Sequence, residues 1–285
     1  MPATIDTLVE DIYKLFDTDN KVVVKINEED LKVFAETTVA AVVSSLSKEV
    51  REPYLRVSMI GQPDRKIWNA LNCIPKEKLS APTLIKFLYG SILENMLILL
   101  VKAAGHTIED PQKEVFISDV KGHHDAIVDG VVVDFKSASD FGFKKFTDGT
   151  LTTDDPFGYV AQLSAYAHAN KSKSNKAGFI AINKVSGEIA YSPLHSIDYI
   201  NPEARISHIK EILKSPVPPP KCFDAVPEGK AGNMRLATGC QYCDFKFSCW
   251  SDSNNGHGLR SFKYANGVKY LTQVNKEPDV PEVHP

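Results

Sequence analysis

Two acidic residues and a lysine flank a predicted turn, and their spacing suits metal chemistry. Asp129-Gly130 is a strong signal for a two-residue β-hairpin loop. With that loop, Asp125 lies opposite Asp134, and Lys136 follows on the same face because side chains alternate along a strand. Two opposed carboxylates repel each other, and a divalent cation such as Mg²⁺ or Mn²⁺ removes the conflict. The hairpin therefore predicts a metal site in which Lys136 holds a phosphate or a polarised water.

The opposite face of the same hairpin is apolar, which supports this register. Five residues alternate with the polar ones and form a core surface, namely Ala126, Val128, Val131, Val133 and Phe135. The register also places His123 opposite Lys136. A solvated face with exposed acids is the alternative interpretation, and a β-bulge would break the register.

A third carboxylate, Glu94, lies within a long segment that is predicted to be a helix over 82–104. Pro82 suits its first turn and Gly105 suits its C-terminal stop. The residues three and four positions from Glu94 are mostly apolar, and a carboxylate on such a stripe is costly unless it is paired or bound to a metal. We expect Glu94 to join the metal site; the alternative is an exposed position on the solvent side of the helix.

Two polar side chains share one face of the helix predicted to follow the hairpin. Gln162 and Tyr166 are four residues apart, and both can hydrogen-bond a substrate phosphate or base. A tyrosine packed between a helix and a sheet is the competing explanation. Asp155 is the expected N-cap of this helix, which ends near Ala169.

A long loop, 138–155, separates the hairpin from that helix. Its aromatic rings alternate with two basic residues, Lys144 and Lys145. Such a mixture suits single-stranded nucleic acid, because bases stack on rings and phosphates are neutralised. We therefore assign Phe143, Lys144 and Lys145 to substrate binding. Rings that anchor the loop to the protein body, including Phe141 and Phe146, are the alternative.

The cysteines indicate a second metal centre. Cys240, Cys243 and Cys249 form a C-x2-C-x5-C pattern, which can bring three thiolates onto one metal or cluster. Cys222 as the fourth ligand would make a local zinc site, whereas Cys73 would tie this segment to the region before the long helix, as iron–sulfur ligation allows. The spacing leaves both choices open. Five cysteines, an odd number, favour a reducing compartment over a disulfide framework.

The periodicity predicts an α/β fold with a small mixed sheet, in the order helix, three strands, helix, strand. Helices are expected over 5–16, 29–47, 63–71, 82–104, 156–169 and 202–214, and strands over 114–118, 123–128, 131–137, 177–183 and 188–192. We expect four parts: a helical extension (1–56), a catalytic core (57–215), a cysteine-rich segment behind a proline-rich linker (216–272) and a disordered tail (273–285).

Composition limits the classes of protein that remain. Hydrophobic residues make up 43% and charged residues 24% of the 285 residues, as in globular proteins. The longest apolar run, 96–101, is far shorter than a membrane span needs, and the acidic start fits neither a secretory signal nor a transit peptide, so we expect a cytoplasmic protein. A net charge of −3 means that any nucleic-acid site is a local patch.

At these residues the sequence resembles the PD-(D/E)xK nucleases, in particular the RecB-type branch that carries an iron–sulfur cluster and includes the AddB nuclease domain and the CRISPR-associated adaptation exonucleases. The resemblance covers about 58–250 and rests on Gly90-Ser-Ile-Leu-Glu94, Gly122-His-His-Asp125, Asp134-Phe-Lys136, Gln162-Leu-Ser-Ala-Tyr166 and the cysteine spacing. The branch commonly has histidine at the position of Glu94, and His124 replaces the proline of the family name.

The resemblance implies a restriction-endonuclease-like αβββαβ core that works as a Mg²⁺- or Mn²⁺-dependent deoxyribonuclease, specifically an exonuclease. It implies that Glu94, Asp125 and Asp134 bind the metal, that Lys136 completes the catalytic set, and that Gln162 and Tyr166 hold the DNA strand. Its iron–sulfur segment implies a [4Fe–4S] cluster on Cys73, Cys240, Cys243 and Cys249, with Cys222 spare.

The implied substrate is DNA, as a single strand or at DNA ends, and no membrane is involved. A stand-alone recombination exonuclease of a phage or a prokaryote, working in the cytoplasm with a recombination or replication partner, fits this size. The rival interpretation is a catalytically silent nucleic-acid-binding subunit, whose four C-terminal cysteines hold a structural Zn²⁺.

Overall fold

A computed structural model of the chain describes residues 3–19, 26–47 and 53–284. The chain forms two units, the first from residues 1–61 and 80–206 and the second from residues 62–79 and 207–285. These bounds differ from the ranges expected from the sequence, because 62–79 groups with the C-terminal segment. Within the second unit Trp68 Nε1 donates to the carbonyl of Ser215 at 3.0 Å, and Arg65 donates to Pro219 at 2.9 Å.

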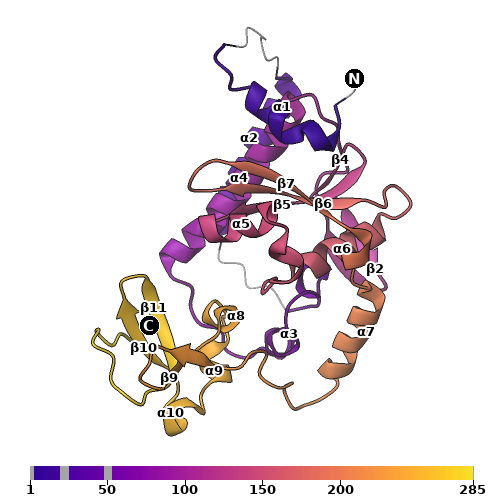
Figure 1. The fold of residues 1–285 in the computed structure, drawn as a ribbon. Helices are drawn as coiled ribbons and strands as arrows, with labels where there is room; N and C mark the ends of the chain where they lie inside the picture. The colour runs from indigo at the N-terminus through magenta and orange to yellow at the C-terminus, as the bar shows by residue number, and fades with distance from the viewer. Residues whose placement is uncertain (1–2, 20–25, 48–52, 285) are drawn as a thin grey trace. The chain divides into compact units, whose positions relative to one another are not determined.

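The first unit contains a five-stranded mixed sheet, and the protein is therefore of the expected α/β class. The strand order is β1-β4-β5-β6-β7, in which β5 and β6 run parallel and the other neighbours antiparallel. Figure 1 labels β4, β5, β6 and β7. The strands are β1 (Ile108–Glu109), β4 (Ala126–Val128), β5 (Val131–Ala138), β6 (Ala177–Asn183) and β7 (Ile189–Leu194). A separate hairpin pairs β2 (Glu114–Ile117) with β3 (Val120–His123).

Helices of the first unit pack on both faces of this sheet. One face is covered by α1 (Leu8–Lys14) and α4 (Ala81–Ala103), and buried residues from these helices and from β4, β5 and β6 form one core cluster. On the other face lie α5 (Asp140–Thr147) and α6 (Tyr159–Ala169), which contact β5 and β6. α2 (Glu28–Leu46) packs on α4, and α7 (Pro202–Leu213) crosses the boundary between the units.

α4 is the long helix expected from the sequence, with Ser80 at its N-cap and Pro82 in its first turn. By length and composition alone this helix could cross a membrane. In this structure it packs against α1, α2, β1 and β5 as a helix of the folded unit.

The second unit contains short elements, of which the sequence predicted only the helix over 63–71. Its four-stranded sheet has the order β10-β11-β9-β8. The strands are β8 (Val226–Glu228), β9 (Asn233–Arg235), β10 (Arg260–Tyr264) and β11 (Gly267–Gln273), and the helices are α3 (Asp64–Leu71), α8 (Thr238–Gln241), α9 (Lys246–Cys249) and α10 (Ser253–Gly256).

The C-terminal tail is ordered through most of its length, contrary to the disorder expected over 273–285. The backbone N–H of Val283 donates to the carbonyl of Ser261 at 2.8 Å, and Lys263 donates to the carbonyl of Pro281 at 2.9 Å. Proline lacks a backbone donor but keeps its carbonyl, so Pro281 can still pair with the edge of β10. Arg260 adds ion pairs to Glu277 and Glu282.

Candidate active site

The β4–β5 hairpin has the predicted loop and register. Ile127 pairs with Val132 and Val128 with Val131, so two residues connect the strands. Asp129 and Gly130 have φ values of 47° and 76°, the positive values that a tight type I′ turn requires. The predicted apolar face lies in the core, with Ala126, Val128, Val131, Val133 and Phe135 all buried.

The two hairpin acids are neighbours, although Asp125 lies just beyond the end of the paired ladder. β4 begins at Ala126, and Asp125 Oδ2 accepts a 2.8 Å hydrogen bond from the backbone N–H of Phe135. His123 does not face Lys136 as expected. It belongs to β3, where it is exposed and pairs with Glu114, because the chain leaves the sheet between β3 and β4.

Asp134 and Lys136 form an ion pair inside the site. Only 1% of Asp134 is exposed; Lys136 pairs with its Oδ2, and Gln162 Nε2 donates to its Oδ1 at 3.3 Å. Burial disfavours the charge of Lys136, but the carboxylates of Asp134 and Asp125 outweigh it and raise the pKa of the lysine. The ammonium therefore stays protonated at any physiological pH.

Glu94 faces the hairpin acids rather than the solvent side of α4. Burial raises its pKa to about 7, and the negative charge of Asp134 contributes to this rise. Lys136 and a 2.7 Å hydrogen bond from Gln112 Nε2 act in the opposite direction. Near neutral pH Glu94 is thus partly protonated, and a cation could displace this proton.

The three acids share an electrostatic conflict. Burial, followed by the charges of Asp134 and Glu94, raises the pKa of Asp125 well above its ordinary value. Burial also raises the pKa of Asp134 in spite of Lys136. Such perturbed carboxyl groups are typical of functional sites. Among the described residues no three His, Cys, Asp or Glu side chains converge closely enough to hold a metal ion as they stand. The donor set itself, three carboxylates, has the hard oxygen chemistry that Mg²⁺ and Mn²⁺ prefer.

Gln112 is a site residue that sequence reasoning missed. Its side chain donates to Glu94, and its backbone N–H donates to the carbonyl of Asp125 at 2.9 Å. The residue has a φ of 53°, a left-handed conformation that costs free energy outside glycine. Gln112 therefore links the strand end that carries Asp125 to the helix that carries Glu94. A turn residue of this kind belongs to no periodic pattern.

His124 is buried and has a structural place beside Asp125. Its Nε2 donates to the carbonyl of Asp110 at 2.8 Å, and its Nδ1 accepts from Asn170 Nδ2 at 2.7 Å, which assigns the tautomer from its partners. Burial lowers the pKa of His124 and keeps the ring neutral. With both ring nitrogens engaged, His124 supports the turn and offers no lone pair to a metal.

The predicted pair on α6 lies at the site, but only one of its members reaches the acids. Gln162 donates to Asp134, and the side chain of Tyr166 forms a hydrogen bond with that of Gln162. Tyr166 is 2% exposed and is therefore too buried for the direct contact with a substrate that the sequence predicted. Its role is instead to support Gln162.

The expected loop over 138–155 contains α5, and this changes the roles of its aromatic rings. Ser139 caps the helix by accepting from the N–H of Gly142 at 3.4 Å. Phe143 is 6% exposed, and Phe146 packs edge-on against Phe179, so both rings anchor α5. The assignment of Phe143 to substrate binding is therefore corrected. Of the aromatic and basic side chains in this segment, Phe141, at 72%, and Lys144 are exposed, while Lys145 pairs with Asp154.

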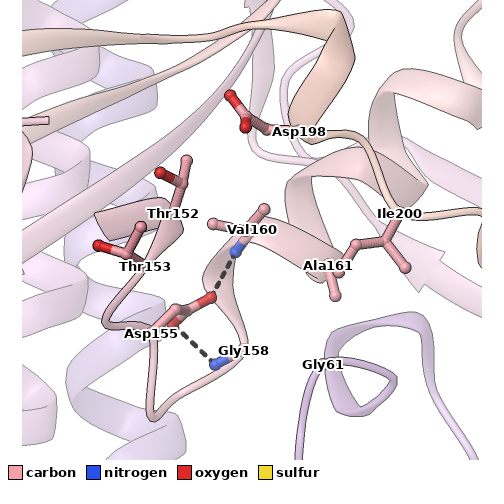
Figure 2. A pocket seen from close by; sticks show the side chains of 9 residues that line it. All are labelled: Gly61, Thr152, Thr153, Asp155, Gly158, Val160, Ala161, Asp198 and Ile200. Carbon is pink, nitrogen blue, oxygen red and sulfur yellow. Dashed lines mark hydrogen bonds between the residues drawn. The ribbon is translucent and has the colours of Figure 1, made fainter. Parts of the chain in front are cut away.

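Asp155 holds the loop that leads into α6. It lies three residues before Gly158, which is the N-cap of the helix. Its carboxylate accepts hydrogen bonds from the N–H of Gly158 at 2.9 Å and of Val160 at 2.8 Å (Figure 2). α6 therefore begins at Tyr159. The same loop lines a cavity of about 430 Å³, whose other polar lining groups belong to Thr152, Thr153 and Asp198.

The cysteines lie in the second unit, and the described chain contains no disulfide. Cys240 is buried in a cluster with Leu236 and Trp250, against which Cys249 and Phe223 pack. Burial raises the pKa of Cys240, and the thiolate charges of Cys243, Cys222 and Cys249 add to the rise.

Cys222 and Cys73 have different surroundings in this unit. The ring of Phe223 lies against Gly239, which brings Cys222 beside the C-x2-C loop. Partial burial raises the pKa of Cys222, and the charge of Cys249 adds to it. Both cysteines are exposed, and Cys73 lies shortly after α3 with a φ of 55°. The cysteine spacing left the fourth ligand open, and these surroundings favour Cys222.

No protein-family model matches the sequence, and no curated protein matches it. Among solved structures, the chain is similar to one described as the crystal structure of SSO0001, with a TM-score of 0.41 and 17% sequence identity. The match covers 75% of this chain and 94% of that one. The function of the site is therefore argued from its own residues.

Proposed function

We propose that the chain is a Mg²⁺- or Mn²⁺-dependent DNA exonuclease with a RecB-type PD-(D/E)xK core. The observation that carries the proposal is the buried Asp134–Lys136 pair, with Asp125 and Glu94 close enough that burial and the charge of Asp134 raise the pKa of both. A folding argument gives no reason to bury three carboxylates around one lysine, since each unpaired charge costs free energy. A divalent cation and a phosphodiester together balance such a site.

The proposed roles follow from the contacts of each residue. Glu94, Asp125 and Asp134 would hold the cation, which supplies a Lewis acid for phosphodiester hydrolysis when it is bound. Lys136 keeps its proton and is placed to stabilise the negative charge that develops on the phosphate oxygens. Gln162 orients Asp134 by hydrogen bonding, and Tyr166 supports Gln162.

We also propose that the cysteine segment holds a [4Fe–4S] cluster that is structural. Cys240, Cys243 and Cys249 are three of its ligands, and the family resemblance names Cys73 as the fourth. Four thiolates suit iron–sulfur ligation as well as Zn²⁺. The position of Cys222 favours the zinc alternative.

The substrate proposed is DNA with an accessible single strand or end, processed in recombination, repair or replication in a bacterial or phage-infected cytoplasm. Support comes from α5, which follows β5 directly and exposes Phe141 and Lys144. An exposed aromatic ring and an exposed ammonium on one helix suit the binding of single-stranded DNA.

A second candidate function is a catalytically silent nucleic-acid-binding subunit with structural Zn²⁺. Its specific support is the position of Cys222 near the C-x2-C loop, where a local zinc site would need it. The two functions differ in whether the acids are needed for DNA turnover.

Hydrolysis of end-labelled DNA by the full chain tests the proposal. We expect shortening of the labelled strand with Mg²⁺ or Mn²⁺ and none with EDTA. Asp134→Asn should lower the rate on the order of 100-fold or more, because a proposed ligand is lost and with it the charge stabilisation that the bound cation supplies. Asp148→Asn, an exposed carboxylate at the end of α5, is the matched control and should keep the rate. Equal activity of Asp134→Asn and wild type would overturn the proposal.

A further inference from the structure

A stack of one cation and two rings leads from the proposed catalytic lysine to the protein surface. Lys136 Nζ lies 4.8 Å from the ring centroid of Tyr159. Tyr159 in turn stacks on Phe157, with centroids 5.6 Å apart and an interplanar angle of 28°. Phe157 is 47% exposed, so the outer ring of this stack is partly open to solvent. A charged and aromatic ladder of this kind serves no evident purpose in the core.

The loop that carries Phe157 is held at both ends. Asp155, two residues before Phe157, accepts hydrogen bonds from the N–H groups of Gly158 and Val160, which lie on either side of Tyr159 in the sequence (Figure 2). Gly158 has a φ of 78°, and a Cβ built on it would lie 2.1 Å from the carbonyl oxygen of Gly61. The backbone therefore has no room to shift toward Gly61. An aromatic ring on so fixed a loop can accept a partner at a low cost in conformational entropy.

The lining of the neighbouring cavity suits the edge of a base better than a phosphate. Two carboxylates, Asp155 and Asp198, and the hydroxyls of Thr152 and Thr153 line it (Figure 2). Carboxylates repel a phosphate but accept hydrogen bonds from the amino groups of nucleobases. Positive charge is instead offered by Lys136, at the inner end of the stack. The geometry thus separates a place for a phosphate from a place for a base.

We propose that Phe157 is the stacking platform for an unpaired nucleobase next to the phosphate that is cleaved. In a single strand one sugar separates each base from its phosphate, so a phosphate at Lys136 brings a base of the same or the adjacent nucleotide to Phe157. This inference rests on the proposed nuclease function and adds a residue to it. Phe157 selects an unstacked base, and hence a frayed end or a single strand, over an intact duplex.

Binding of fluorescently labelled single-stranded DNA, measured by anisotropy with Ca²⁺ in place of Mg²⁺, tests the platform without turnover. Phe157→Ala should weaken binding about 5- to 150-fold, the range expected from ~1–3 kcal/mol per stacked base. Phe157→Trp should restore it, and Phe157→Leu should not, because leucine keeps the apolar area but lacks a π-face. Val185→Ala, another exposed apolar residue of the first unit, should bind as wild type.

An abasic scan of the oligonucleotide identifies the base itself. Replacing one nucleotide at a time by an abasic site should weaken the binding of wild type at one position, and that loss should be absent in Phe157→Ala. Abasic losses of the same size in both proteins, or wild-type affinity in Phe157→Ala, would overturn the platform and leave the nuclease proposal intact. A wild-type chain that neither binds nor hydrolyses DNA would overturn both.

Discussion

Gln112 Nε2 donates a 2.7 Å hydrogen bond to Glu94 Oε1, which joins a turn residue to a carboxylate on a different element. Because the backbone N–H of the same glutamine donates to Asp125, the turn sets the spacing between two of the proposed ligands. An amide donor stabilises the ionised form of a carboxylate and so lowers its pKa. Gln112 is thus placed to prepare Glu94 for a cation.

Replacing Gln112 by Ala should weaken metal binding without unfolding the protein. Loss of one hydrogen bond to a charged group corresponds to roughly a tenfold rise in the Kd for Mn²⁺, measured by isothermal titration calorimetry at neutral pH. Gln273→Ala, which removes an exposed glutamine of the second unit, is the control. Equal Mn²⁺ affinity in wild type, Gln112→Ala and Gln273→Ala would show that Gln112 does not contribute to metal binding.

Metal binding should depend on pH around neutrality. The pKa of Glu94 is about 7 in the folded chain against an ordinary 4.5, so below pH 7 protons compete with the cation. Mn²⁺ affinity should rise as pH rises through about 7 and then level off. Glu94→Gln should lower the affinity and flatten this dependence between pH 6 and pH 8, and an unchanged slope in that variant would assign the titration to another group.

The same shift predicts how stability varies in the absence of metal. A carboxyl group whose folded-state pKa is raised binds protons more tightly when folded, so its contribution to stability is present below pH 4.5 and is lost as pH rises through about 7. Thermal melts in EDTA should therefore show a larger loss from pH 5 to pH 8 in wild type than in Glu94→Gln. Added Mn²⁺ should raise the melting temperature more at pH 8 than at pH 5.

Lys136→Met should destabilise the protein as well as inactivate it. Without the ammonium, Asp134, Asp125 and Glu94 remain buried together with no cation among them, and breaking a buried pair from one side costs about 3–5 kcal/mol. The melting temperature in EDTA at pH 8 should fall, and Mn²⁺ should recover part of the loss. Asp134→Asn combined with Lys136→Met should be less destabilised than Lys136→Met alone, and a melt unchanged by Lys136→Met would place the lysine outside the acid cluster.

The two candidate fourth cysteines make a matched pair of variants. If the [4Fe–4S] proposal holds, protein purified without oxygen absorbs broadly near roughly 400 nm. Cys73→Ser should remove this absorbance, whereas Cys222→Ser should keep it. Colourless protein with one zinc per chain, lost in Cys222→Ser and kept in Cys73→Ser, would contradict the cluster and favour the local zinc site beside Phe223.

The sequence predicted those parts of the first unit in which local chemistry agrees with packing. The Asp129-Gly130 turn and the alternation of valines defined the register of β4 and β5, because a slip by one residue would expose the apolar face. Pro82 similarly marked the start of α4. Asp134 and Lys136 followed from that register.

The parts of the fold and the site that the sequence did not predict depend on contacts between residues that follow no helical or strand periodicity. Gln112 reaches Glu94 from a turn with positive φ values at non-glycine residues, and turn signals rest mainly on Gly and Pro. α5 is short, so two buried rings rather than helical periodicity hold it in place. The small sheet of the second unit consists of strands as short as three residues, such as β8. The edge strand of this sheet pairs with the backbone around Pro281, whereas the prolines of the tail had led us to expect disorder.

Anomalous diffraction from crystals of the chain grown with Mn²⁺ tests the central claim most directly. The account predicts a manganese peak that contacts carboxylate oxygens of Asp134 and Asp125, with Glu94 in its coordination sphere, and Lys136 Nζ turned away from Asp134 Oδ2 toward solvent or phosphate. Crystals that hold Mn²⁺ elsewhere, with the Asp134–Lys136 pair intact and no peak among the three acids, would contradict it.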